Sequence, residues 1–135
     1  MALLTVNGGI RATGDVTAFY SSDERLKENI QPIPEALKKL EGRRGVSYDW
    51  VQNASQLLGE FDGYFARQGN HGVIAQELES VLPDAVRERP PNDQGTSYKA
   101  VEYLAVVALL IEGVKELHEQ VQSLEARVQT LESAE

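Results

Sequence analysis

The sequence contains no cysteine, and this single absence excludes several kinds of chemistry. Disulfide bonds, cysteine-ligated zinc and a thiol nucleophile all need a residue that the chain does not have. Histidine is almost as scarce, since only His71 and His118 are present, and no paired-ligand motif surrounds either of them. We therefore expect neither a metal site nor a bound cofactor.

Positive charge and long apolar runs are also scarce. The 135 residues carry a formal net charge of −8, and no stretch is dense in lysine and arginine. Nucleic acid is not an expected partner, because neutralising its phosphates needs clustered positive charge. The longest apolar stretch, residues 104–111, falls well short of the ~18 residues of a membrane span. The first residues also lack the pattern of a signal peptide, so we expect a soluble protein made in a cytoplasm.

The residues that are present favour a globular protein. Hydrophobic residues make up 41% of the chain and charged residues 25%, which is typical of folded rather than disordered sequences. The length suits one ordinary domain with a short appendage.

Short strands and helices are expected in the first three quarters of the chain, which predicts an α+β fold. Residues 1–21 are interpreted as strands and turns at the end of a β-structured stalk, with a tight turn at Asn7-Gly8-Gly9. Residues 34–40 predict a helix that ends at Gly42. The remaining predictions are a strand at 46–50, a loop with one weak strand over 51–70, a strand at 72–75, a helix at 76–82 and a β-hairpin from 85–89 and 96–100.

The clearest local pattern is an apolar seam in the C-terminal part, which predicts a long helix over residues 104–135. Valine and leucine alternate at spacings of three and four residues, which is a heptad repeat with valine at a and leucine at d. Such a narrow stripe favours contact with the helix of another chain. The seam consists of Val107, Leu110, Val114, Leu117, Val121, Leu124, Val128 and Leu131.

Two alternatives for this seam stay open. The helix could be a single amphipathic helix that packs on its own domain. The number of associated chains is also open, because valine at a with leucine at d usually favours two strands. The heptads therefore predict an oligomer without fixing its size.

Ser22 and Lys27 are the candidate catalytic pair. A lysine can act as general base for a serine if burial or a positive neighbour lowers its pKa, and Arg25 is such a neighbour in the sequence. In a helix, five residues place the two side chains about 140° apart, and in a strand they lie on opposite faces. The pair can meet only if the chain bends between them or if the lysine comes from another subunit. The alternative is a solvated charged run with Ser22 or Asp23 as the N-cap of a helix.

A series of motifs along the chain resembles the endosialidase-type intramolecular chaperone domains, which lie at the C-terminus of phage tailspikes, tail fibres and neck appendages. A related domain occurs in a membrane-bound animal transcription factor. The resemblance covers about residues 20–131. The motifs are Ser-Asp-Glu-Arg-Leu-Lys-Glu-Asn-Ile at 22–30, Tyr-Asp-Trp at 48–50, His-Gly-Val-Ile-Ala-Gln-Glu-Leu at 71–78, Leu-Pro-Asp-Ala-Val at 82–86, and Tyr98 with Tyr103-Leu104.

This resemblance implies a homotrimer in which a serine–lysine dyad cuts the chain immediately before the serine. Carried over to this sequence, Ser22 is the nucleophile, Lys27 is the base, and the bond between Ser21 and Ser22 is cleaved. Ser21 lacks the five-residue spacing to the lysine. His71 is a candidate for a supporting role in catalysis.

The resemblance also implies how the chain is divided. Residues 1–21 would be the end of the fibre stalk that cleavage releases, and residues 22–103 the chaperone and autoprotease core. Residues 104–135 would form the helix of a homotrimeric coiled coil.

The implied function is an intramolecular chaperone that trimerises, assists the folding of the upstream fibre or spike of the same chain, and then removes itself. It would act in the host cytoplasm during phage assembly, leaving the stalk in the virion tail and the cleaved chaperone absent from the mature virion. The alternatives are a permanent trimerisation cap with an inactive dyad, a serine protease with multiple turnover, and a membrane-anchored regulator.

Overall fold

A computed structural model gives the structure of the chain and describes residues 1, 4–8, 10, 21–58, 68–89 and 91–134. It divides into two units, Met1–Gln31 and Pro32–Glu135. The predicted boundaries at residues 21/22 and 103/104 stay predictions.

The first unit contains one regular element among its described residues, the short 3-10 helix η1 at Glu24–Leu26. Residues 4–8 and residue 10 lie in neither helix nor strand, with a bend at Asn7-Gly8. Residues 11–20, which include part of the predicted stalk, lie outside the described residues. The β-structured stalk therefore stays a prediction.

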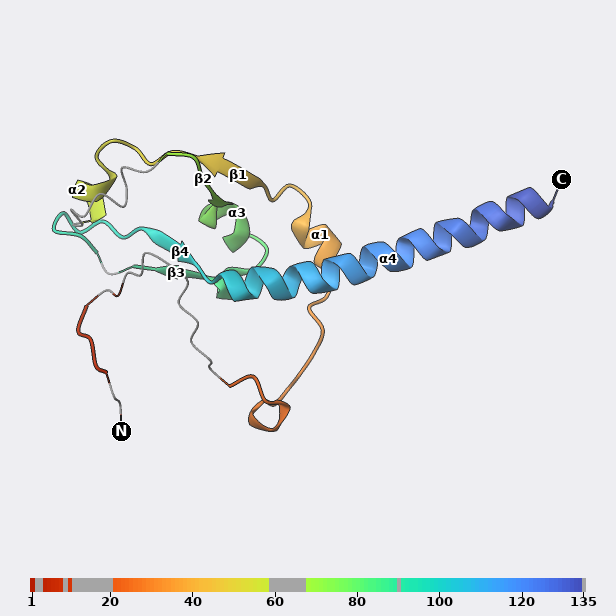
Figure 1. Ribbon diagram of the computed structural model, residues 1–135, viewed down its shortest axis with the longest axis horizontal. Helices are drawn as coiled ribbons and strands as arrows, with labels where there is room; N and C mark the ends of the chain where they lie inside the picture. The colour runs from red at the N-terminus through yellow and green to blue at the C-terminus, as the bar shows by residue number, and fades with distance from the viewer. Residues whose placement is uncertain (2–3, 9, 11–20, 59–67, 90, 135) are drawn as a thin grey trace. The chain divides into compact units, whose positions relative to one another are not determined.

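The second unit combines short helices with two antiparallel pairs of strands (Figure 1). Strand β1, Gly45–Tyr48, pairs with β2, Asn70–Val73, and places Val46 opposite Gly72. Strand β1 overlaps the strand predicted at 46–50. Strand β2 begins earlier than the strand predicted at 72–75 and shares only Gly72 and Val73 with it. Ala75 already belongs to helix α3, Ala75–Glu79.

The second antiparallel pair follows helix α3 and is a β-hairpin. After the short 3-10 helix η3, Pro83–Ala85, strand β3 at Val86–Glu88 pairs antiparallel with β4 at Lys99–Val101. This confirms the predicted hairpin. Lys99 of β4 forms an ion pair with Glu79 at the end of α3, so the hairpin is tied to the helix that precedes it.

Helix α1, Ala36–Leu40, confirms the predicted short helix, and Gly42 follows it with a φ of 73°. This left-handed conformation is accessible to glycine and terminates the helix.

Residues 51–70 were predicted as a loop with a weak strand, and this prediction is wrong for Ala54–Leu58, which form helix α2. Ala54 is buried, so the short helix is held by packing that no local apolar period reveals.

The long helix α4 runs from Tyr103 to Ser133 and confirms the predicted C-terminal helix. A few turns from its start it lies beside α1 (Figure 1). Leu109 of α4 is fully buried. Gly113 makes the contact with α1 close, because a Cβ at that position would lie 2.5 Å from Cδ1 of Leu40. The chain is thus a mixed α+β structure with a long terminal helix.

The core of the second unit is small. The buried apolar residues among those described are Ala36, Ala54, Leu78, Ala85 and Leu109. Three of these are alanines, so the unit buries little apolar side-chain surface of its own. Small domains with such cores usually gain stability from association or from other constraints.

Candidate functional site

The candidate catalytic segment folds as a tight turn in the first unit. Asp23 is the N-cap of η1, and its carboxylate accepts the backbone N–H of Arg25 at 2.9 Å. The backbone N–H of Lys27 donates to the carbonyl of Glu24 at 3.0 Å and closes the turn. Beyond it, Lys27 returns to extended geometry, with φ −118° and ψ 148°. The chain therefore bends sharply between Ser22 and Lys27.

This bend brings the two candidate side chains together. Nζ of Lys27 donates a hydrogen bond to Oγ of Ser22 at 2.6 Å. Neither a continuous helix nor a strand would allow this contact at a spacing of five residues, so the turn is what makes it possible. The contact lies within one chain and needs no lysine from a neighbour.

Arg25 has a different partner from the one that the sequence suggested. Its Nε and Nη2 donate to the two carboxylate oxygens of Asp23 at 3.0 and 2.9 Å. The side-chain hydrogen bonds from Arg25, and then its backbone N–H, lower the pKa of Asp23. The side-chain bonds in turn raise the pKa of Arg25. The guanidinium charge is thus paired with Asp23.

The two adjacent serines differ in their contacts. Oγ of Ser21 accepts the backbone N–H of Asp23 at 3.4 Å, whereas Oγ of Ser22 faces the amine of Lys27. Both hydroxyls are exposed. The geometry agrees with the spacing argument that Ser22, rather than Ser21, is the serine that Lys27 can serve.

His71 lies on β2 in the second unit, opposite Ser47 of β1, and is exposed. The candidate pair belongs to the first unit. The supporting catalytic role of His71 therefore stays a prediction.

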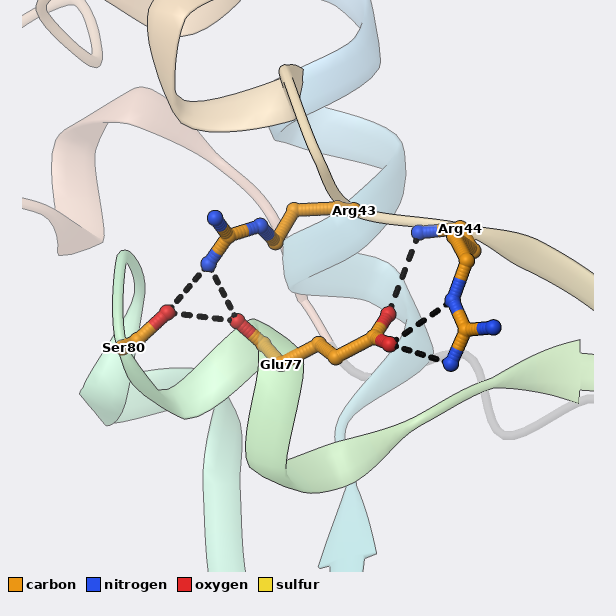
Figure 2. A network of polar contacts seen from close by, with 4 residues as sticks. All are labelled: Arg43, Arg44, Glu77 and Ser80. Carbon is orange, nitrogen blue, oxygen red and sulfur yellow. Dashed lines mark hydrogen bonds and ion pairs between the residues drawn. The ribbon is translucent and has the colours of Figure 1, made fainter.

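The motif around His71 continues into a polar network that the sequence did not reveal (Figure 2). Nε and Nη2 of Arg44 donate to one carboxylate oxygen of Glu77 at 2.8 and 2.5 Å. Nη1 of Arg43 donates to the carbonyl of Glu77 at 2.8 Å and to the hydroxyl of Ser80. The side-chain bonds from Arg44 lower the pKa of Glu77. The network ties the start of β1 to α3, so these residues hold the fold together.

The apolar seam of α4 forms a candidate assembly surface. Its eight residues are all exposed, from 43% for Val121 to 68% for Leu131. Helix α1 contacts α4 at residues outside the seam, namely Gly113 and Glu116. Within the described residues the domain therefore leaves the seam uncovered, which argues against the alternative of an amphipathic helix that packs this stripe on its own domain.

Two further apolar residues widen this surface at its N-terminal end. Leu104 and Ile111, at the e positions of the heptads, are 77% and 56% exposed. The later e positions carry polar residues, namely His118, Glu125 and Glu132. The exposed apolar stripe is thus broadest where α4 lies beside the folded domain.

The described residues show neither a metal-binding cluster nor a membrane-spanning helix. Within the described ranges, no group of three or more histidines and carboxylates is arranged to hold a metal ion. Among the described helices, none has the length and apolar character needed to cross a membrane.

Comparisons with known proteins agree with the motifs. The family model described as "chaperone of endosialidase", a peptidase family, matches residues 22–87. The chain carries a domain of the chaperone of endosialidase family. This confirms the resemblance drawn from the sequence motifs. The match begins at Ser22, the residue that accepts the hydrogen bond from Lys27.

Relatives of this chaperone domain include viral and cellular proteins. The long tail fiber protein Gp37 of Enterobacteria phage K3 is 37% identical over 125 residues, which are 90% of this chain and 9% of the relative. The Gp37 protein of phage T2 gives the same values. Myelin regulatory factor homolog 1 of Caenorhabditis elegans is 40% identical over 91 residues, which are 64% of this chain and 9% of the relative. The chain thus spans only a small part of each of these proteins.

Proposed function

We propose that this chaperone domain belongs to a phage tail fibre or tailspike, assembles it as a homotrimer and then separates from it by cutting between Ser21 and Ser22. The observation that carries the proposal is the 2.6 Å hydrogen bond from Lys27 to Ser22. It falls on the first residue of the family match. The likeness to the phage tail fibre proteins supports a role in virion assembly.

The proposed cleavage is an N-to-O acyl shift followed by hydrolysis. Oγ of Ser22 attacks the carbonyl carbon of Ser21 while the neutral amine of Lys27 takes the hydroxyl proton. The C–N bond then breaks, the amine of Ser22 receives the proton, and an ester joins the Ser21 acyl group to Oγ of Ser22. Water hydrolyses the ester and restores the hydroxyl. Residues 1–21 leave with a new carboxylate, and residues 22–135 begin with a new amine.

Two requirements of this reaction point to assembly. A lysine acts as a base only without its extra proton, and desolvation favours that neutral form. Both Ser22 and Lys27 are exposed in the single chain. The developing oxyanion also needs a hydrogen-bond donor. We propose that a neighbouring copy covers the pair, so that cleavage follows correct assembly.

The sequence of the terminal helix α4 supports a parallel arrangement of the helices from neighbouring copies. In a parallel coiled coil, a g residue faces the e residue of the next heptad on the neighbouring helix. This pairing would set Arg127 against Glu132 and Val106 against Ile111, an ion pair and an apolar pair. The added exposure of Leu104 and Ile111 gives a wider stripe than two helices need, which favours three.

Assembly through this helix explains a chaperone role physically. Intertwined β-structured chains must find a common register before long-range contacts stabilise them, and this search is slow. A helical bundle at one end holds the chains together and raises their effective concentration. After cleavage the fibre would persist because its unfolding is slow.

The second candidate function is a permanent trimerisation cap that never cleaves. The exposure of the Ser22–Lys27 pair in the single chain favours it, because a solvated lysine is a poor base. Both functions share the same assembly and differ only in the fate of one peptide bond.

The test compares the parent chain of residues 1–135 with Lys27→Met, which keeps the length of the side chain and removes the amine. Intact mass under denaturing conditions reports cleavage, and native mass reports assembly. The proposal expects a cut parent, an uncut variant and a trimer for both. An uncut parent that is still a trimer would establish the permanent cap instead.

A further inference from the structure

We infer that Asp23 is a positioning residue for the Ser22–Lys27 pair and acts through its clamp on Arg25. The inference rests on the proposed cleavage and assigns a role to the residue between the nucleophile and the turn. Asp23 touches neither reacting side chain in the structure. Its carboxylate instead holds the backbone conformation that lets Lys27 reach Ser22.

The clamp consists of three hydrogen bonds on one carboxylate. Oδ1 of Asp23 accepts the backbone N–H of Arg25 at 2.9 Å and its Nε–H at 3.0 Å. Oδ2 accepts Nη2 of Arg25 at 2.9 Å. Asp23 thus caps the turn through the backbone N–H of Arg25 and also holds the Arg25 guanidinium. Both contacts fix the start of η1.

No packing performs this task among the described residues. Helix η1 has only three residues and none of them is buried, and Leu26 is 75% exposed. Short 3-10 turns have poor hydrogen-bond geometry and are stable only with added support. Two backbone hydrogen bonds close the turn, from Leu26 to Asp23 and from Lys27 to Glu24, and the three bonds of the clamp reinforce it. Without the clamp, the turn would sample extended conformations.

An extended segment would separate the two reacting groups. Five residues in a strand place the side chains on opposite faces, and the backbone itself spans ~16 Å at about 3.3 Å for each residue. The rate of an intramolecular reaction depends steeply on such positioning, and a misplacement of ~1 Å costs about 10²-fold. The clamp therefore sets how often the Lys27 amine is in reach of the Ser22 hydroxyl.

The test measures the rate of self-cleavage of the full chain after release from denaturant, by intact mass at successive times. Asp23→Ala removes the cap and the ion pair and should slow cleavage by ~10- to 100-fold. Asp23→Asn keeps an oxygen that can cap the turn and should fall between Asp23→Ala and the parent. Arg25→Met leaves the cap but removes the grip on the guanidinium and should also slow cleavage. Glu28→Ala, an exposed acid just after the turn, is the matched control and should cleave at the parent rate.

The native mass of each variant must remain that of the parent, which separates positioning from a general loss of folding. Recovery of rate in the order alanine, asparagine, aspartate supports a clamp, because a merely charged surface residue would not show it. If the parent cleaves and Asp23→Ala and Arg25→Met cleave equally fast, the clamp is wrong and the proposed function stands. If the parent does not cleave, the proposed function and the clamp are both wrong.

Discussion

The carboxylate of Glu116 on α4 accepts the backbone N–H of Ala36 at the start of α1 at 2.8 Å, across a separation of 80 residues. Its second oxygen accepts the N–H of Leu37, also at 2.8 Å. Helix α1 has no side-chain cap of its own, because the residue before it, Glu35, adopts a φ of 52° and caps nothing. The long helix therefore supplies the cap and sets where α1 sits along it.

Replacing Glu116 should loosen this contact. Glu116→Gln keeps one acceptor but turns an N–H donor toward the helix end, so we expect thermal unfolding a few degrees below that of the parent. Glu119→Gln, an exposed acid on the same helix, is the matched control. Circular dichroism checks both, and equal melting temperatures for parent and Glu116→Gln would contradict the capping role.

The same cap predicts a pH dependence. The backbone N–H groups of Leu37 and Ala36 lower the pKa of Glu116 below the ordinary value of 4.5. A group with a lowered pKa stabilises the fold above its unfolded value, and this contribution is lost as pH falls through the folded pKa. The difference in melting temperature between parent and Glu116→Gln should therefore be full at neutral pH and should vanish in acid. A difference that is constant with pH would argue against an ionised cap.

The packing of α4 on its domain should depend strongly on Leu109, the only large side chain that is fully buried among the described residues. Leu109→Ala removes that packing and leaves a cavity, which should lower the free energy of unfolding by about 2–5 kcal/mol. Urea denaturation followed by the fluorescence of Trp50 measures it. A loss below about 1 kcal/mol would show that the interface collapses around the smaller residue or contributes little.

The seam of α4 should decide assembly without affecting the folded domain. Leu117→Asp and Leu124→Asp each place a charge on the exposed apolar stripe and should convert the proposed trimer to smaller species in sedimentation experiments. Gln122→Asp adds the same charge beside the seam and should leave assembly nearly intact. If cleavage requires a neighbouring copy, the two seam variants should also stop cutting themselves. A seam variant that no longer assembles but still cleaves at the parent rate would show that the Ser22–Lys27 pair is active in a single chain.

The proposed parallel alignment of α4 helices predicts an ion pair between Arg127 of one copy and Glu132 of another. Arg127→Glu would set two acids against each other in the proposed pairing with Glu132 of a neighbouring copy, and the assembly should melt a few degrees lower. Adding Glu132→Arg to the same chain should restore most of the loss, with the effect reduced at high salt. A double variant that melts at the sum of the two single losses would contradict this register.

The sequence predicted those parts of the fold that depend on local pattern. The long helix, the hairpin of β3 and β4, and the helix ending at Gly42 all carry turn residues or periodic apolar positions that fix them within a few residues. Helix α2 was missed. Its Ala54 is buried, and the carbonyl of its Leu57 accepts the side-chain amide of Asn92, a contact that the local sequence does not reveal. Propensity alone does not encode such packing.

The candidate site shows the same division. The spacing of Ser22 and Lys27 presented a geometric obstacle, and only the structure shows that a turn capped by Asp23 removes it. Asp23 was considered as a cap, but its ion pair with Arg25 was not foreseen. Glu116 was missed entirely, since a bond between residues 80 positions apart leaves no local trace in the sequence.

The most direct test of the central claim compares Ser21→Ala with Ser22→Ala by intact mass under denaturing conditions. The two changes are chemically identical and adjacent, so they differ only in which hydroxyl is lost. If Ser22 is the nucleophile, Ser21→Ala should split into residues 1–21 and 22–135, and Ser22→Ala should stay whole. Cleavage of Ser22→Ala, or a cut that is lost with Ser21 instead, would contradict the assignment of the nucleophile and of the bond that it breaks.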